Sequence, residues 1–109
     1  MKTAIIGSRD LVVDLQKYLP AGITMVVSGG SRGIDTLAEL YAYVNDIPKM
    51  IFLPEYDKHG KQAPLVRSKL IVDNADMVVA FWDGKSAGTK FAIDYAKSIN
   101  KEVIVHLFQ

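Results

Sequence analysis

The amino-acid sequence predicts a single three-layer α/β domain, residues 1–109, with a mostly parallel five-stranded sheet flanked by four helices. Two observations carry this prediction. The short apolar runs are nearly continuous rather than alternating, which is typical of strands buried on both faces of a parallel sheet. Between these runs, apolar residues recur at helical spacing, and glycine-bearing loops join the two kinds of segment. No linker or internal repeat divides the chain.

Five apolar runs predict the strands: Ala4 to Ile6, Ile23 to Val27, Lys49 to Leu53, Met77 to Trp82 and Glu102 to Phe108. Helical spacing predicts four helices between them: Leu11 to Leu19, Ile34 to Ala42, Pro64 to about Asn74, and Ala92 to Ile99. Pro20 and Gly22 are expected to end the first helix, and Pro64 suits the first turn of the third. Strands that alternate with helices favour parallel pairing, because a parallel connection must cross back along the sheet.

Composition excludes several classes of protein. The 13 lysine and arginine residues nearly balance the 12 aspartate and glutamate residues, and the net charge of +1 argues against a protein that coats nucleic acid. The chain has no cysteine, which excludes disulfides and zinc ribbons. No apolar run reaches the length of a signal-peptide core or a membrane span. We therefore expect a soluble, cytoplasmic protein without membrane association.

The predicted loops at the carboxyl ends of the strands carry the candidate binding residues, because ligands of open parallel sheets bind at that edge. Glycine lets the backbone approach a ligand, and free amides at a helix start attract an anion. The loops combine glycines with hydroxyls and cations, so we expect a phosphate or carboxylate ligand. The candidate ligand-binding residues are Gly7, Ser8, Arg9, Ser28, Gly29, Gly30, Ser31, Arg32, Gly33, Asp35, Arg67, Asp83, Gly84, Lys85, Ser86, Gly88 and Thr89.

The arginines favour an anionic ligand. The chain has only three, Arg9, Arg32 and Arg67, and each lies in or beside a predicted carboxyl-end loop. Arginine suits bidentate contact with phosphate or carboxylate, whereas the lysines are spread over the whole chain. A purely structural alternative stays open: the glycines only make tight turns, and Ser31, Asp35 and Ser86 only cap helices.

Two familiar nucleotide-binding motifs are absent. Gly84-Lys85-Ser86 resembles the end of a P-loop, but that motif needs glycine where the chain has Val79. The glycines around Gly30 have Ser28 where the dinucleotide fingerprint has its first glycine. His59 and His106 have no neighbours at metal-ligand spacing. The sequence therefore supports neither a P-loop ATPase, nor a conventional nicotinamide enzyme, nor a metal site.

Three segments together resemble the SLOG superfamily, and most closely its small YspA/YAcAr-type branch of bacteria and phages. They are Gly7-Ser8-Arg9-Asp10, the run from Val27 to Glu39 that contains Ser-Gly-Gly-Ser-Arg-Gly-Ile-Asp, and the run from Ala80 to Thr89. The resemblance covers nearly the whole chain. It implies a Rossmann-like fold that binds nucleotides and related ligands. The superfamily includes the LONELY GUY phosphoribohydrolases, molybdenum-cofactor carriers and DNA-processing protein A.

The resemblance to the phosphoribohydrolases is incomplete. It implies that Arg67, nine residues before Asp76, is the retained arginine of that group, and that Gly84, Gly88 and Thr89 echo its glycine motif. The glutamate of the motif would fall at Ala92. Cleavage of an N-glycosidic bond needs a carboxylate, and Asp35 and Asp83 are the candidates for it. Arg67 is the third candidate catalytic residue.

Three functions follow as hypotheses. The first is binding of a nucleotide or a nucleotide-derived, phosphate-containing small ligand, an ADP-ribose-like one among them, by a sensor or carrier. The second is a phosphoribohydrolase-like N-glycosidic hydrolase acting on nucleotides. The third is single-stranded nucleic-acid binding, which the balanced charge disfavours. Whether the protein is an enzyme, and whether it forms a homo-oligomer, stays open.

Overall fold

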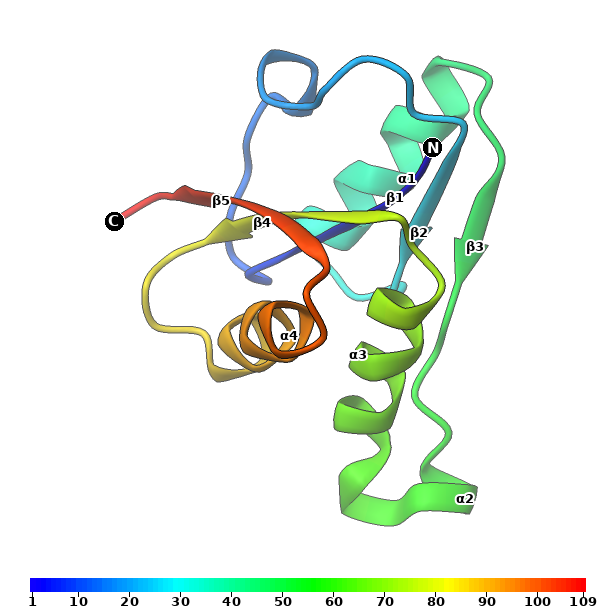
Figure 1. Ribbon diagram of the computed structural model, residues 1–109, viewed down its shortest axis with the longest axis vertical. Helices are drawn as coiled ribbons and strands as arrows, with labels where there is room; N and C mark the ends of the chain where they lie inside the picture. The colour runs from blue at the N-terminus through cyan, green and yellow to red at the C-terminus, as the bar shows by residue number, and fades with distance from the viewer.

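A computed structural model describes all 109 residues as a Rossmann-like three-layer α/β fold (Figure 1). Its sheet is entirely parallel, with strand order β3-β2-β1-β4-β5. The five strands are β1 (Lys2–Gly7), β2 (Met25–Ser28), β3 (Lys49–Ile51), β4 (Met77–Trp82) and β5 (Glu102–Leu107). The predicted fold class and the five predicted strands are thus confirmed, with shifts of a few residues at their ends.

Helices cover both faces of the sheet. The helices are α1 (Ile34–Val44), α2 (Tyr56–His59), α3 (Ala63–Asp73) and α4 (Ala87–Ser98). In Figure 1, α3 and α4 lie next to each other on one side of the sheet and α1 lies on the other. The short α2 stands away from the sheet, within the segment that joins β3 to α3. None of the helices is long and apolar enough to cross a membrane.

The two central strands, β1 and β4, explain the continuous apolar runs. Adjacent residues of a strand point to opposite faces. Ile5 accordingly packs into the core beneath α1, while Ile6 packs into the core beneath α3 and α4. Val79 and Val78 divide in the same way. Because both faces of these strands are buried, their sequences do not alternate between apolar and polar residues.

The predicted first helix, Leu11 to Leu19, is wrong. Only Leu15–Lys17 forms a single 3-10 turn, and Leu15 is its one buried residue. The Asp14 side chain accepts a hydrogen bond from the backbone N–H of Gln16, a local bond that competes with helix formation. Val12, counted in the predicted apolar pattern, is 84% exposed. The apolar spacing was real, but too few of its residues are buried to stabilise a helix.

The fourth helix begins earlier than predicted, at Ala87 rather than Ala92. Gly88 and Thr89, which are predicted to lie in a loop, therefore belong to the first turn of α4. The third helix is close to the prediction, since Pro64 occupies its first turn and Asn74 is its C-cap. These starts matter because both helices begin at the carboxyl edge of the sheet.

The strand order reverses direction between β1 and β4. The chain leaves β1 for β2 and β3 on one side of the sheet and returns for β4 and β5 on the other. In open parallel sheets a crevice forms at the carboxyl ends of the strands where the order reverses, and ligands bind there.

Candidate functional site

A pocket of about 130 Å³ lies at the carboxyl end of β1, at the reversal point of the sheet. Four parts of the chain supply its walls: the end of β1, the loop between β2 and α1, one face of α3 and the first turns of α4. The lining residues are Ile6, Gly7, Arg9, Ser31, Asp35, Pro64, Leu65, Arg67, Ser68, Ile71, Ser86, Gly88, Thr89 and Ala92. Hydroxyls, two arginines and one carboxyl group therefore converge on a single hollow.

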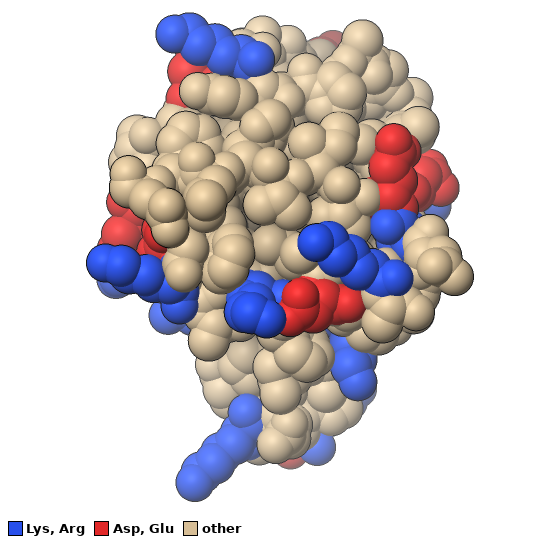
Figure 2. Space-filling view, turned by 60° about the vertical axis from the view of Figure 1, so that its left-hand side comes forward, with Lys and Arg blue, Asp and Glu red and all other residues tan.

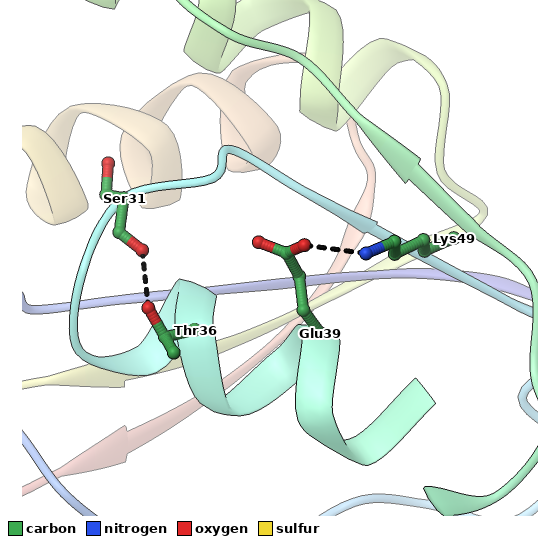
Figure 3. A network of polar contacts seen from close by, with 4 residues as sticks. All are labelled: Ser31, Thr36, Glu39 and Lys49. Carbon is green, nitrogen blue, oxygen red and sulfur yellow. Dashed lines mark hydrogen bonds and ion pairs between the residues drawn. The ribbon is translucent and has the colours of Figure 1, made fainter. Parts of the chain in front are cut away.

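A larger hollow, about 770 Å³, lies elsewhere and lacks these features. It is lined by the end of α1 and the start of β3, far from the carboxyl edge. Its cation, Lys49, donates from Nζ to Glu39 at 2.7 Å (Figure 3). Because its charge is already paired and no helix begins there, the larger hollow is not the candidate site.

Arg67 projects from α3 and binds the loop after β2. Its Nη1 donates to the Gly29 carbonyl oxygen at 2.9 Å and lies 3.5 Å from the Ser31 hydroxyl. A Cβ at Gly29 would lie 2.8 Å from that Nη1, so only glycine allows so close an approach. The other N–H groups of this guanidinium make no hydrogen bond within the chain, which leaves them free for a ligand.

Asp35 lies in the first turn of α1 and is buried. Its Oδ2 accepts from the Ser31 N–H at 3.1 Å, and its Oδ1 lies 3.0 Å from the Ser28 hydroxyl. Burial raises the pKa of Asp35, although these two hydrogen bonds and the charge of Arg67 act in the opposite direction. Asp35 is therefore a carboxyl group held toward its protonated form.

The Ser28 hydroxyl lies between Asp35 and the backbone of β1. It lies 3.0 Å from the Ile5 carbonyl oxygen and 3.0 Å from Asp35 Oδ1. A hydroxyl has one proton, so it donates fully to only one of these two oxygens. Its hydrogen bond to Asp35 Oδ1 acts to lower the pKa of that carboxyl group, against the effect of burial, and links Asp35 to β1.

Two further contacts hold the backbone of the loop between β2 and α1. The Thr36 hydroxyl donates to the Ser31 carbonyl oxygen at 3.0 Å, and Figure 3 shows the Ser31 hydroxyl turned away from this contact. A Cβ at Gly33, where φ is +74°, would collide with the Arg9 carbonyl oxygen. This contact ties the loop after β1 to the start of α1, and it positions Arg9 at the pocket.

The loop between β4 and α4 is organised by Asp83 and Trp82. Asp83 Oδ1 accepts from the N–H groups of Lys85 and Ser86, both at 2.8 Å. These two backbone bonds are the main cause of the lowered pKa of Asp83. The Trp82 Nε1 donates to the Ser86 carbonyl oxygen at 3.0 Å, and its ring packs against the core. Both side chains shape this loop instead of facing the pocket.

Gly88 opens the pocket onto the start of α4. It is not among the glycines with positive φ, and a Cβ built there would meet nothing within 4 Å. Beside it, the hydroxyls of Ser86 and Thr89 lie 3.2 Å apart. Neither φ nor packing requires glycine here, and its missing side chain leaves the helix amides accessible. Such amides, with the helix dipole, favour an anion.

The structure brings together eight of the residues expected at the site: Gly7, Arg9, Ser31, Asp35, Arg67, Ser86, Gly88 and Thr89. Arg32 is not among them. Its Nη2 pairs with Asp10 Oδ1 at 3.1 Å on the surface, and its side chain is 72% exposed. Of the three arginines at the carboxyl edge, Arg9 and Arg67 line the pocket.

The remaining expected residues lie outside the pocket lining. Ser8 accepts a hydrogen bond from the Asp83 N–H at 3.2 Å, which joins the loops after β1 and β4. Ser28 and Gly29 contact Asp35 and Arg67 as described above. The others outside the lining are Gly30, Gly33, Asp83, Gly84 and Lys85.

Sequence reasoning missed one wall of the pocket. Pro64, Leu65, Ser68 and Ile71 line it with Arg67 from α3, and Ile6 and Ala92 complete the lining. The spacing of positions 64, 67, 68 and 71 is that of one helix face, a signal that was present in the sequence. No group of His, Asp and Glu side chains in the structure is arranged to hold a metal ion.

Charges of both signs are mixed over the surface. Figure 2 shows lysine and arginine next to aspartate and glutamate, with a broad uncharged area in the upper middle of that face. The four surface ion pairs include Lys90 with Asp94 and Lys58 with Glu55. This view contains no continuous basic stripe of the kind that follows a nucleic-acid backbone.

Comparison with known proteins finds a relative of this chain in a phage. The chain is 30% identical over 102 aligned residues to the Gene 61 protein of Mycobacterium phage D29. The alignment covers 87% of this chain and 80% of the phage protein. No protein-family model matches the chain. No solved structure matches it. Because the likeness extends over most of both proteins, the chain belongs to the family of this phage Gene 61 protein.

Proposed function

We propose that this protein binds a nucleotide or a nucleotide-derived, phosphate-containing small ligand in the pocket at the carboxyl end of β1. One observation carries the proposal. The unpaired N–H groups of Arg67 and the open first turn of α4 at Gly88 face the same pocket at the reversal point of a parallel sheet. Arg9 adds a second cation to this wall.

The size of the pocket indicates which part of the ligand it holds. Its volume of about 130 Å³ is well below the ~300–1,000 Å³ of pockets that enclose a drug-sized ligand. It suits a phosphate with an attached sugar better than a whole dinucleotide. In this proposal, the amides of Gly88 and Thr89 and the guanidinium of Arg67 hold the phosphate, and the base lies outside, over the exposed loops.

The same features support membership of the SLOG superfamily as a proposal. The three segments that carry the resemblance end β1, link β2 to α1 and link β4 to α4. In the fold, the loops from all three meet around one pocket. The proposed ligand class agrees with what that resemblance implies.

A thermal-shift screen tests the proposal. Its probes are nucleoside monophosphates, ADP and ADP-ribose, with nucleosides and inorganic phosphate as the comparison. A ligand at about 100 times its Kd stabilises the folded state by about 2.7 kcal/mol, which for a domain of this size raises Tm by about 10 °C. We expect phosphorylated compounds to raise Tm and nucleosides to have no effect.

Two variants give this screen its control. Gly88→Leu adds a side chain in open space at the pocket, so the variant should fold and lose the ligand-induced rise in Tm. Arg32→Ala removes a cation that lies outside the pocket, so it should keep the full rise. The proposal is overturned if no phosphorylated compound raises Tm, or if Gly88→Leu responds as the unmodified protein does.

A second candidate function rests on Asp35. A carboxyl group in the pocket wall whose pKa is raised by burial, close to Arg67, is the kind of group that serves N-glycosidic hydrolysis as a general acid. Asp83 does not fit that role, because its carboxylate binds the backbone of its own loop. Release of free base from nucleoside monophosphates, followed by chromatography, tests for this activity. Asp35→Asn should abolish base release, and full turnover in that variant rules out the hydrolase.

A further inference from the structure

The two edges of the sheet are protected to different degrees. An exposed edge strand presents unpaired N–H and C=O groups, and proteins commonly shield such edges with short strands, lysine, proline or bulges. The edge strand β3 has three residues, begins with Lys49 and follows Pro48. The other edge strand, β5, has six residues and contains none of these devices. Its pairing with β4 runs without a bulge from Glu102 to Leu107.

The free groups of β5 belong to alternate residues. Phe108, just beyond the strand, donates its N–H to the Trp82 carbonyl oxygen at 2.8 Å. The backbone N–H and C=O groups of every second residue before it, at positions 106, 104 and 102, therefore also face β4. By alternation, the N–H and C=O groups of Val103, Val105 and Leu107 point outward from the sheet. The side chains of Val105 and Leu107 are 38% and 54% exposed. In Figure 1, β5 crosses in front of β4 with no other segment beyond it.

We propose that β5 pairs in antiparallel orientation with β5 of a second copy of this chain, about a two-fold axis at Ile104. An antiparallel pair must place outward-facing residues opposite one another, which an axis at any residue of the strand satisfies. The axes at Ile104 and at Val105 pair the most residues of β5. The axis at Ile104 sets Val103 opposite Val105 and Glu102 opposite His106. The axis at Val105 sets Glu102 opposite Phe108 instead, and leaves both polar side chains without a polar partner.

His106 supports the choice of axis. Its ring stacks on Phe81 at 5.2 Å between centroids and meets the edge of Tyr18 at 5.0 Å, which fixes it on one face of the sheet. Its Nε2 is buried and has no hydrogen-bond partner within the chain, a state that calls for an explanation. Directly opposed residues of the non-hydrogen-bonded class bring their side chains closest. In the proposed pair, Glu102 of the second copy therefore brings a carboxylate beside this imidazole.

Single cysteines test the axis, because the chain has no cysteine of its own. With the axis at Ile104, the two copies of that residue face each other at a Cα separation of about 4.5 Å, which a disulfide spans. We expect Ile104→Cys to form a covalent dimer under mild oxidation at least ~10 times faster than Val103→Cys or Val105→Cys, because those pairs are displaced along the strand. Faster cross-linking of Val105→Cys overturns the proposed axis.

Light scattering coupled to size exclusion tests the interface itself. The unmodified protein should elute as a dimer, and Val105→Lys, which supplies the missing edge lysine, should elute as a folded monomer with unchanged circular dichroism. Tyr43→Lys is the matched control, because it alters the most exposed aromatic residue of α1, 85% exposed and away from β5. A monomeric unmodified protein, or a dimer lost in Tyr43→Lys and kept in Val105→Lys, overturns the proposal and in the second case assigns the interface to α1.

Hydrogen exchange gives a readout that does not depend on cysteine. In the dimer, the outward amides of residues 103 and 105, which lie opposite each other across the axis, should exchange at least ~10 times more slowly than in Val105→Lys, because only pairing with a second strand protects them. The amides that face β4 should be protected in both proteins. Equal exchange of the outward amides in the two proteins contradicts pairing through β5.

Discussion

The loops that precede α1 and α4 share a composition of glycine, hydroxyl and cation, yet they are held by different forces. In the loop before α1, Gly29 and Gly33 allow close contacts with Arg67 and with the Arg9 backbone, and Asp35 anchors the loop from a buried position. In the loop before α4, the half-buried Asp83 does the anchoring, and Gly88, in the first turn of α4, faces open space. The first loop is packed against its neighbours and supports the pocket, whereas the second leads into a helix turn whose backbone amides are accessible to a ligand. Similar sequence therefore serves two different physical roles.

Gly33→Ala should break the packed loop and have the largest effect. The added Cβ would collide with the Arg9 backbone at a φ of +74°, and neither partner has a flexible end that could move away. We expect a loss of about 3 kcal/mol or more in the free energy of unfolding, measured with urea. Gly22→Ala has a similar positive φ but open space around it, so its loss should be only about 1 kcal/mol. Equal losses in the two variants would contradict a role for the collision.

Arg67→Ala should have the next largest effect. It leaves the Gly29 carbonyl oxygen without its partner and removes the cation near Asp35, so we expect a loss of about 1–3 kcal/mol. The matched Arg32→Ala breaks only an exposed ion pair and should change stability by less than about 1 kcal/mol. Urea unfolding of both variants at neutral pH measures the contrast, and a larger loss in Arg32→Ala would reverse the assignment of the two arginines.

Asp35→Asn and Asp83→Asn should change the pH dependence of stability in opposite directions. The pKa of Asp35 is raised above 3.8 in the folded state, so unmodified protein loses stability as pH rises from about 3.8 through the folded value. The amide introduced by Asp35→Asn can keep the same hydrogen-bond partners without a charge, so that decline should disappear.

The pKa of Asp83 is lowered, so its stabilising contribution is present above 3.8 and is lost as pH falls through the folded value. Asp83→Asn should therefore flatten the acid side of the stability profile. Urea unfolding at a series of pH values from acid to neutral measures both changes. If both substitutions changed the slope of stability against pH in the same direction, the contrast between the buried Asp35 and the half-buried Asp83 would be contradicted.

Gly88→Ala should have the smallest effect on stability. Its Cβ enters open space in a helix, where alanine is better tolerated than glycine, so stability should stay unchanged or rise by up to about 1 kcal/mol. The ligand-induced rise in Tm should fall nonetheless, because the methyl group lies against the proposed phosphate. A large loss of stability would show that Gly88 is a packing residue like Gly33.

Much of this architecture is predictable from the sequence, because the physical cause is local. β1 and β4 are buried on both faces and give continuous apolar runs, and α1 gives a clear stripe. The segment from Leu11 to Leu19 shows the limit of such reasoning. Its apolar spacing resembles that of a helix, but the local bond of Asp14 and the exposure of Val12 produce a single 3-10 turn. Periodicity reports which residues are apolar, and only packing decides whether they are buried.

The sequence by itself determined the parallel α/β class and the placing of glycines, hydroxyls and arginines in carboxyl-end loops, since strand and turn preferences act over a few residues. The tertiary structure alone decided which of those residues meet. Arg9 reaches the pocket because Gly33 packs against its backbone, whereas Arg32 turns outward to Asp10. It also decided that Asp35 is buried and that β5 has a free edge. Those features depend on contacts between residues far apart in the chain, which the local pattern does not encode.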